Sequence, residues 1–316
     1  MSVSLSSPTS LPLRLGASLS IVLCAACAST SSTQETSIQD ELTLPGDRAR
    51  SRMVEQPLGF FLRDINGDIR GWTQLTMTAR SEEDRRKAEL LEQTIARRSN
   101  ERIDELIHEL ESGPRSHRVI AASALGFTGD EKALSPLLSA LEDPDPEIQS
   151  NALLGLRLLN VEATPLTRIC ELMRYGEDSW IRSNAASCLS TLTNAGARAD
   201  CVLECARYGL ADPEPVVRSH SSLILATLVD ASSIGEMADL LDDEVPLVRS
   251  AAMRSLAYVG TKDLTTKANA AKSLVGAYIR SSGKERWKYV QALQQISGRP
   301  YGDDEEEWTD WARRLQ

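Results

Sequence analysis

The side chains that most often carry chemistry are few in this 316-residue chain, which has six cysteines and three histidines. Cys201 and Cys205 stand four residues apart, so a helix would place them on one face, and His220 follows in the next segment. A structural zinc ion takes four ligands, and this set lacks a fourth. Small cysteines are common in helical cores, so we expect packing residues here and neither a metal nor another cofactor.

The other candidate sites are equally incomplete. Cys170 and Cys188 would bridge the two helices of one structural unit in an oxidising compartment, and the alternative is that all four downstream cysteines are small core residues. The stretch "DINGD" (64–68) lacks the later ligands of a calcium loop and is typical of a turn. The isolated histidines form no recognisable catalytic triad. We therefore predict that the protein is not an enzyme.

A pattern that recurs five times between residues 117 and 256 defines the elements that position these residues. An apolar residue precedes a marker residue, small residues follow it, and Leu comes seven positions later. The separations between the markers are 31, 33, 36 and 31 residues, a period typical of a solenoid of helix pairs. The markers are Arg118, Gln149, Arg182, Arg218 and Arg249.

Paired prolines mark the turn inside each unit, as in "ADPEPVVRSH" (211–220) and "EDPDPEIQSN" (142–151). Proline suits the first turn of a helix, and it disfavours helix in the residue before it. Pro213 and Pro215 therefore end one helix and begin the next. We expect Asp212 to cap the new N-terminus.

These repeats resemble HEAT repeats over about residues 100–260. The matching features are the Val-Arg pair and small-residue run of the second helix, and a turn aspartate at Asp143, Asp178, Asp212 and Asp243. The resemblance implies an all-α fold, a right-handed α-α superhelix of about five to seven helix pairs. It also implies Asp–Arg ladders between neighbouring repeats, interrupted where Gln149 replaces arginine.

The flanking segments are expected to close this array. We divide the chain into an N-terminal capping segment (57–100), the repeat array (101–260) and a C-terminal helix pair with a tryptophan-containing cap (261–316). Residues 57–72 form a short hairpin or lie over the first helix, and Ser81 begins a capping box for a helix over 81–98. Trp308 and Trp311 lie three residues apart, so both can cover the exposed end of the stack.

The first residues are typical of an export signal. An apolar stretch from Leu15 to about Ala26 is too short to span a membrane, which indicates a signal peptide over residues 1–26. Its end, "LCAAC", resembles the lipobox of bacterial lipoproteins, although Cys24 stands where the family usually has Leu. That resemblance implies lipidation of Cys27, a polar linker over 27–56 and a place in the bacterial cell envelope. The alternative is cleavage at the Ala26-Cys27-Ala28 site, which releases a soluble exported protein.

The resemblance to HEAT repeats also implies that the second helices line a concave surface. The net charge is −10 and no basic stripe is present, so we expect a protein partner and no nucleic acid. The scaffold would hold an envelope protein; the alternatives are an enzyme accessory or lyase-like HEAT protein, and a purely structural spacer. The expected contact positions lie one and five residues after each marker: Val119, Ser123, Ser150, Leu154, Ser183, Ser187, Ser219, Leu223, Ser250 and Arg254.

The lipid anchor gives a direct prediction. Cells that express the protein and receive a radioactive fatty acid should label it, because the acyl chains are attached to Cys27. The Cys27→Ser variant should carry no label, whereas Cys24→Ser should still be labelled because residue 24 leaves with the signal peptide. Label that persists in Cys27→Ser would rule out this anchor.

Overall fold

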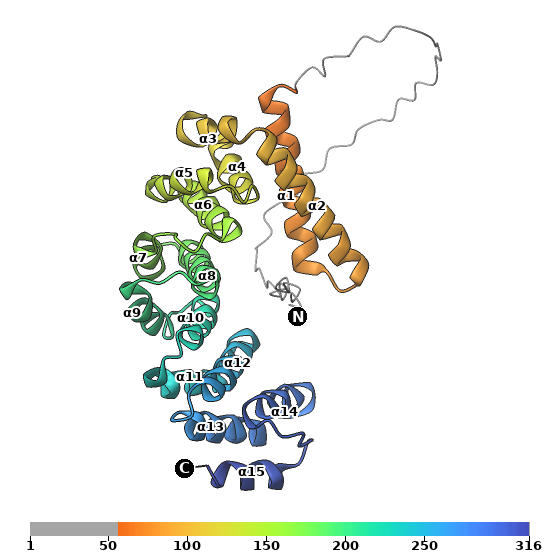
Figure 1. The fold of residues 1–316 in the computed structure, drawn as a ribbon, viewed down its shortest axis with the longest axis vertical. Coiled ribbons are helices and arrows are strands. Elements are labelled where there is room, and N and C mark those ends of the chain that lie inside the picture. The colour runs from red at the N-terminus through yellow and green to blue at the C-terminus, as the bar shows by residue number, and fades with distance from the viewer. Residues whose placement is uncertain (1–55, 316) are drawn as a thin grey trace, which may run out of the picture.

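A computed structural model describes residues 56–315, and within this range the chain forms fifteen α-helices, four short 3-10 helices and no β-strand. Figure 1 shows the helices from α3 onward stacked in a curved row, while α1 and α2 run across its N-terminal end. Fourteen of the helices form seven consecutive pairs. The predicted all-α solenoid is therefore confirmed.

The helices of each pair occupy different sides of the row, with the second helices on its inner, concave side (Figure 1). The five first helices of the repeats are α3 (Ile103–Ser112), α5 (Leu134–Ser139), α7 (Thr167–Tyr175), α9 (Asp200–Gly209) and α11 (Ile234–Asp239). The five second helices are α4 (Arg115–Gly126), α6 (Pro146–Leu159), α8 (Ser179–Ala195), α10 (Pro215–Thr227) and α12 (Pro246–Lys262). The flanking helices are α1 (Leu58–Thr78), α2 (Glu82–Glu101), α13 (Lys267–Arg280), α14 (Gly283–Ser297) and α15 (Glu305–Arg313).

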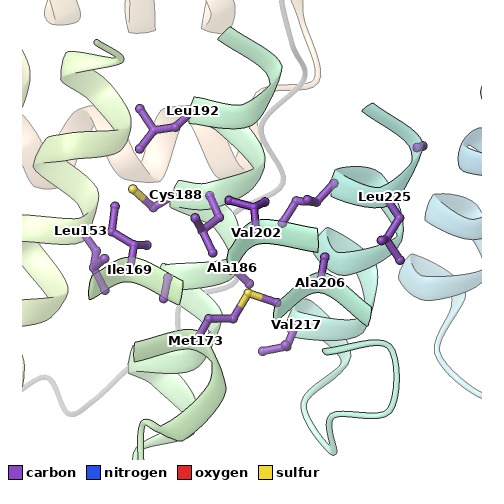
Figure 2. Packing of buried hydrophobic residues seen from close by; sticks show 14 of the residues in the cluster. Leu153, Ile169, Met173, Ala186, Cys188, Leu192, Val202, Ala206, Val217 and Leu225 are labelled. Atoms are coloured by element: carbon purple, nitrogen blue, oxygen red, sulfur yellow. The ribbon is translucent and has the colours of Figure 1, made fainter. Parts of the chain in front are cut away.

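The core is a continuous layer between first and second helices, and Figure 2 shows part of it around α7 to α10. The residue before each marker, the one three after it and the one seven after it are spaced by four, which places them on one face of a helix. In α10 these residues are Val217, Ser221 and Leu225, and all three are fully buried. The middle position is always Ala or Ser, and its small side chain lets neighbouring helices approach closely.

The prolines act as predicted, but the role predicted for Asp212 is wrong. Pro215 is the first residue of α10, whose N-cap residue is Glu214. Asp212 stands two residues earlier, where its Oδ1 accepts a hydrogen bond from the Glu214 backbone N–H at 2.8 Å. It shapes the turn before the helix, and its other contacts join it to the preceding repeat.

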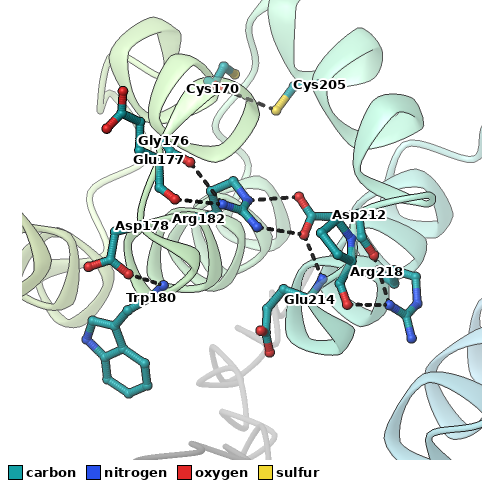
Figure 3. A network of polar contacts seen from close by, with 11 residues as sticks. Cys170, Gly176, Glu177, Asp178, Trp180, Arg182, Cys205, Asp212, Glu214 and Arg218 are labelled. Atoms are coloured by element: carbon teal, nitrogen blue, oxygen red, sulfur yellow. Dashed lines mark hydrogen bonds and ion pairs between the residues drawn. The ribbon is translucent and has the colours of Figure 1, made fainter.

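An Arg–acid ladder connects neighbouring repeats (Figure 3). In the Arg182–Asp212 rung, Nε lies 3.0 Å from Oδ2, and only 14% and 4% of the two side chains are exposed. Burial raises the pKa of the Asp243 carboxyl, but hydrogen bonds from Arg218 and the Val245 backbone outweigh it and leave that pKa below its usual value. The four rungs are Arg118–Asp143, Arg182–Asp212, Arg218–Asp243 and Arg249–Glu285.

At Gln149, where the ladder was predicted to be interrupted, the arginine and its acidic partner are both replaced. Each acid that pairs with an arginine inside the array stands six residues before the next marker, and in the third repeat that position is Gly176. Asp178, predicted as the turn aspartate, is instead the N-cap of α8, where it accepts from the Trp180 backbone N–H. Arg182, Arg218 and Arg249 each also donate to the backbone carbonyl six residues earlier. Gln149 keeps this contact, since its side-chain amide donates to the Asp143 carbonyl at 2.8 Å.

The structure differs most from expectation at residues 57–72. These residues are helical, so the predicted alternative of a short hairpin is wrong. They belong to α1, which packs against α2 and α4, and the "DINGD" stretch lies inside this helix. The predicted capping box at Ser81 is confirmed, since Ser81 and Asp84 exchange hydrogen bonds at the start of α2. Apolar residues at helical spacing on α1 outweigh the turn tendency of its Asn and Gly residues.

The C-terminal end of the row carries an aromatic cluster on α15, which packs against α13. Trp308 is fully buried and its indole N–H donates to the Gly302 carbonyl at 2.8 Å. Trp311 meets it edge to face, with ring centroids 5.8 Å apart, as the predicted cover requires.

The N-terminal predictions are not addressed by these helices. The signal peptide, Cys27 and nearly all of the linker lie outside residues 56–315. Among the helices of that range, none combines the length and the apolar character that crossing a bilayer requires.

Close backbone contact between α4 and α6 gives a stability prediction. A methyl group on Gly155 would collide with the Ala122 carbonyl oxygen and lie 2.8 Å from Leu137 Cδ2. Gly155→Ala should therefore lower the free energy of unfolding by about 1–3 kcal/mol, the usual cost of overpacking. Gly67→Ala is the control, because nothing lies within 4 Å of its added methyl group. Because alanine favours helix more than glycine, Gly67→Ala should raise the free energy of unfolding by about 0.5–1 kcal/mol. Chemical denaturation measures both variants, and equal losses in the two would contradict the packing account.

Candidate functional site

A groove of about 830 Å³ lies between α1 and the second helices α4, α6 and α8. Helix α1 contributes Ile69 and Met77 to its wall, and the repeats contribute Val119, Ile120 and Leu154. The groove thus has an apolar wall and lies at the N-terminal part of the concave side.

Contacts within the first helix pair and to α4 fix the position of α1. The Trp72 and Phe127 rings meet edge to face with centroids 5.0 Å apart. The Trp72 indole N–H donates to Glu92 of α2 at 3.1 Å, and Arg98 of α2 forms an ion pair with Asp68. Together these contacts hold one wall of the groove at a fixed distance from the repeats.

Polar side chains line the floor and rim of the groove. Asn184 of α8 donates to the Ser150 hydroxyl of α6 at 2.5 Å, which links the two floor helices. Arg115 forms ion pairs with Asp145 and Glu147 of the next repeat. Amide and hydroxyl groups beside an apolar wall suit a ligand with both backbone polar groups and apolar side chains.

The structure divides the predicted contact strip. Four of its members line the groove: Val119, Ser123, Ser150 and Leu154. The other six lie on later second helices or outside the groove lining: Ser183, Ser187, Ser219, Leu223, Ser250 and Arg254.

The expected outward orientation is wrong for part of that strip. The buried members are Ser123, Ser150, Ser183 and Ser219. Neighbouring second helices pack so closely that serines one or five residues after a marker touch the adjacent helix, as the Asn184–Ser150 bond shows. Arg254 is the exposed member, and the remaining five are half-buried.

Sequence reasoning missed two contributors to the groove. One is α1, whose buried residues Phe61, Leu62, Ile65, Ile69 and Trp72 follow helical spacing. That period was the available signal. The other is Arg157, a cation on α6 that is only 9% exposed and lines the groove. An arginine among the buried positions of a second helix is unusual, and this was the available signal for unusual contacts.

The four cysteines within residues 56–315 are free thiols, and the predicted Cys170–Cys188 bridge is absent from the structure. Cys170 instead meets Cys201 of the next repeat, with the two Sγ atoms 2.8 Å apart, and Cys205 lies close by. A hydrogen bond with Cys205 and burial raise the pKa of the Cys170 thiol well above its usual value, and burial raises that of Cys201 to about 12. The Cys170 and Cys201 thiols are therefore protonated at neutral pH.

The zinc candidate receives no geometric support. Within residues 56–315, no three His, Cys, Asp or Glu side chains are arranged to hold a metal ion. Burial lowers the pKa of His220 to about 4, so this ring is neutral at physiological pH. His117 Nδ1 of α4 lies 2.7 Å from a carboxylate oxygen of Glu109 on α3, so this contact is within the first repeat.

Comparisons with known proteins agree with this architecture. A family profile described as HEAT repeats matches residues 103–198. No curated protein matches the chain.

Solved structures of helical-repeat proteins are similar to part of this chain. The designed armadillo repeat protein YIII(Dq)4CqI is 16% identical, with a TM-score of 0.50, and the match covers 61% of this chain and 99% of that one. Computationally designed armadillo repeat proteins for modular peptide recognition match with 17% identity, a TM-score of 0.49 and coverage of 61% and 98%. The complex of CpcE and CpcF of phycocyanin lyase from Nostoc sp. PCC7120 matches with 18% identity, a TM-score of 0.39 and coverage of 72% and 93%. At these identities the likeness shows the fold alone.

The thiol contact predicts which disulfide this protein forms when oxidised. Diamide, which accepts two electrons from a thiol pair, should produce a Cys170–Cys201 bridge, because only a small movement brings the two sulfurs to bonding distance. The reaction should be faster at pH 9 than at pH 7, since the raised pKa values leave little thiolate at neutral pH. Peptide mapping under non-reducing conditions identifies the bridge. Cys201→Ser should abolish it and Cys188→Ser should not; a Cys170–Cys188 bridge would contradict the geometry.

Proposed function

We propose that this chain is a non-enzymatic scaffold, because its described helices form an α-solenoid and a profile of HEAT repeats matches residues 103–198. Its concave groove holds a segment of another protein, an extended peptide or an amphipathic helix. The fold supplies a rigid curved surface and leaves specificity to the side chains that line it.

The groove is the observation that carries this proposal. Its volume of about 830 Å³ falls within the range of ligand-binding clefts, and a long apolar wall faces amide and hydroxyl groups. A peptide offers both kinds of group along its length. Such a combination supports recognition of a protein segment.

We further propose that the protein works in the bacterial cell envelope, held by lipid on Cys27. The sequence around Cys27 supports this, and the polar segment over 27–56 is suited to act as a tether. A tether of this length lets the groove reach a partner near the membrane. Cleavage at the Ala-x-Ala site, which gives a soluble exported form, is the alternative.

The other candidate roles fit the groove less well. A pure spacer requires no shaped cleft. A lyase-like or enzyme-accessory role requires thiol, imidazole or paired acidic groups that converge on a pocket. The groove is lined by apolar, amide, hydroxyl and charged side chains, and this lining supports binding better than bond chemistry.

Site-specific crosslinking tests the scaffold. The photo-reactive amino acid benzoylphenylalanine, placed at position 154 in the groove, should crosslink the partner in intact cells. The same residue at position 90 is the control, because Leu90 lies on α2 with 63% of its surface exposed. The Leu154→Glu variant should lose the partner in pull-downs from membranes, since a carboxylate on the apolar wall is costly to desolvate.

The pattern of crosslinks decides the outcome. Crosslinked bands that form with benzoylphenylalanine at position 154, and do not form with it at position 90, would place the partner in the groove. Equal crosslinking at both positions, or pull-downs that Leu154→Glu leaves unchanged, would contradict the proposal.

A further inference from the structure

The strongest unexplained feature of the groove is the cation of Arg157. This residue lies in the last turn of α6, and its side chain is more than nine-tenths buried while still lining the groove. An arginine in such a position keeps its charge, although burial lowers its pKa. A buried ion of this kind normally has an oppositely charged partner.

The contacts of Arg157 are incomplete. Its Nη1 donates to the Ser187 hydroxyl of α8 at 2.9 Å. Its Nε is buried and has no hydrogen-bond partner in the described part of the chain. Among residues 56–315, no ion pair includes Arg157, whereas all four ladder arginines pair with carboxylates.

No neighbouring side chain supplies the missing negative charge. Cys188 is close, but burial raises its pKa to about 12, so it is a neutral thiol. His220 is also neutral, because burial lowers its pKa to about 4, and Arg254 adds a second positive charge nearby. The C-terminal carbonyl groups of α6 provide only a partial negative charge.

The opposite wall of the groove is also positive. Arg70 of α1 lines the groove, is exposed, and forms no ion pair in the described part of the chain. Of the two acids in the lining, Glu147 is already paired with Arg115. The other, Asp178, caps the start of α8 by accepting from the Trp180 backbone N–H and forms no ion pair with either arginine. The groove therefore offers two unpaired guanidinium groups on facing walls of an overall acidic protein.

We propose that the partner segment held in this groove is acidic, and that one of its carboxylates binds the Arg157 guanidinium. The proposal rests on the scaffold function above and names the chemistry of its ligand. A carboxylate fits because guanidinium and carboxylate form parallel, charge-assisted hydrogen bonds. The apolar wall of Ile69, Val119 and Leu154 holds the rest of the segment. A free anion would leave this wall uncovered.

A random-peptide display library screened against the full chain tests the anchor. Peptides retained by the wild type and lost with Leu154→Glu should be rich in Asp and Glu. In a synthetic peptide of this set, changing the shared Glu to Gln should weaken binding by about tenfold or more in calorimetry. The same change should leave binding to Arg157→Met unaltered.

Two further variants separate anchoring from folding. Arg157→Met should melt at the same or a higher temperature than the wild type, because it removes a buried charge without leaving an unpaired one. Arg157→Lys should keep part of the preference for acidic peptides. Arg280→Met, which removes a charge that pairs with Asp242 outside the groove lining, should bind like the wild type.

The outcomes distinguish the two proposals. Groove-dependent peptides without acidic enrichment, or a Glu-to-Gln penalty equal in wild type and Arg157→Met, would overturn the anchor and leave the scaffold standing. A library that yields no groove-dependent peptide would count against the scaffold itself. If the peptide with phosphoserine in place of the shared Glu binds the wild type about tenfold more tightly, the group that Arg157 recognises is a phosphate and the carboxylate proposal is overturned.

Discussion

A guanidinium group removed from water needs a carboxylate beside it, and this requirement organises the molecule. Each ladder arginine meets it with an acid of the following repeat, as Arg182 does with Asp212. The three aspartates of these pairs are buried and the geometry of the pairs is directional, so they fix how each second helix sits against the next. The small buried residues between the helices can then pack without gaps, and the concave surface has a defined shape.

The groove lies where this pairing changes. Between the second and third repeats, Gln149 and Gly176 stand in place of the arginine and the acid, so this rung is missing. On the inner side, Arg157 reaches Ser187, and Asn184 reaches Ser150, so α6 and α8 are joined by hydrogen bonds along the groove floor. The interface has lost a satisfied ion pair and contains a buried cation with no acid. We infer that the occupant of the groove completes this interface.

The sequence predicted the repeats well because their signals are local and recur. The five markers, the small middle residues and Pro215 each follow from helix geometry, and the structure places them as expected. It predicted the groove poorly, because the groove depends on contacts between distant segments. The strip Ser123, Ser150, Ser183 and Ser219 is buried by the closeness of adjacent helices, which no single repeat encodes. The role of α1 depends on Trp72 meeting Phe127, 55 residues away in the chain.

A crystal structure of the full chain with an acidic peptide bound would show whether the Arg157 guanidinium has an acidic partner in the groove. We expect a peptide carboxylate oxygen within about 3 Å of the Arg157 guanidinium, with the rest of the peptide along the wall of α1, α4 and α6. A peptide bound on the convex side, or one in the groove that leaves Arg157 without an acidic partner, would contradict it.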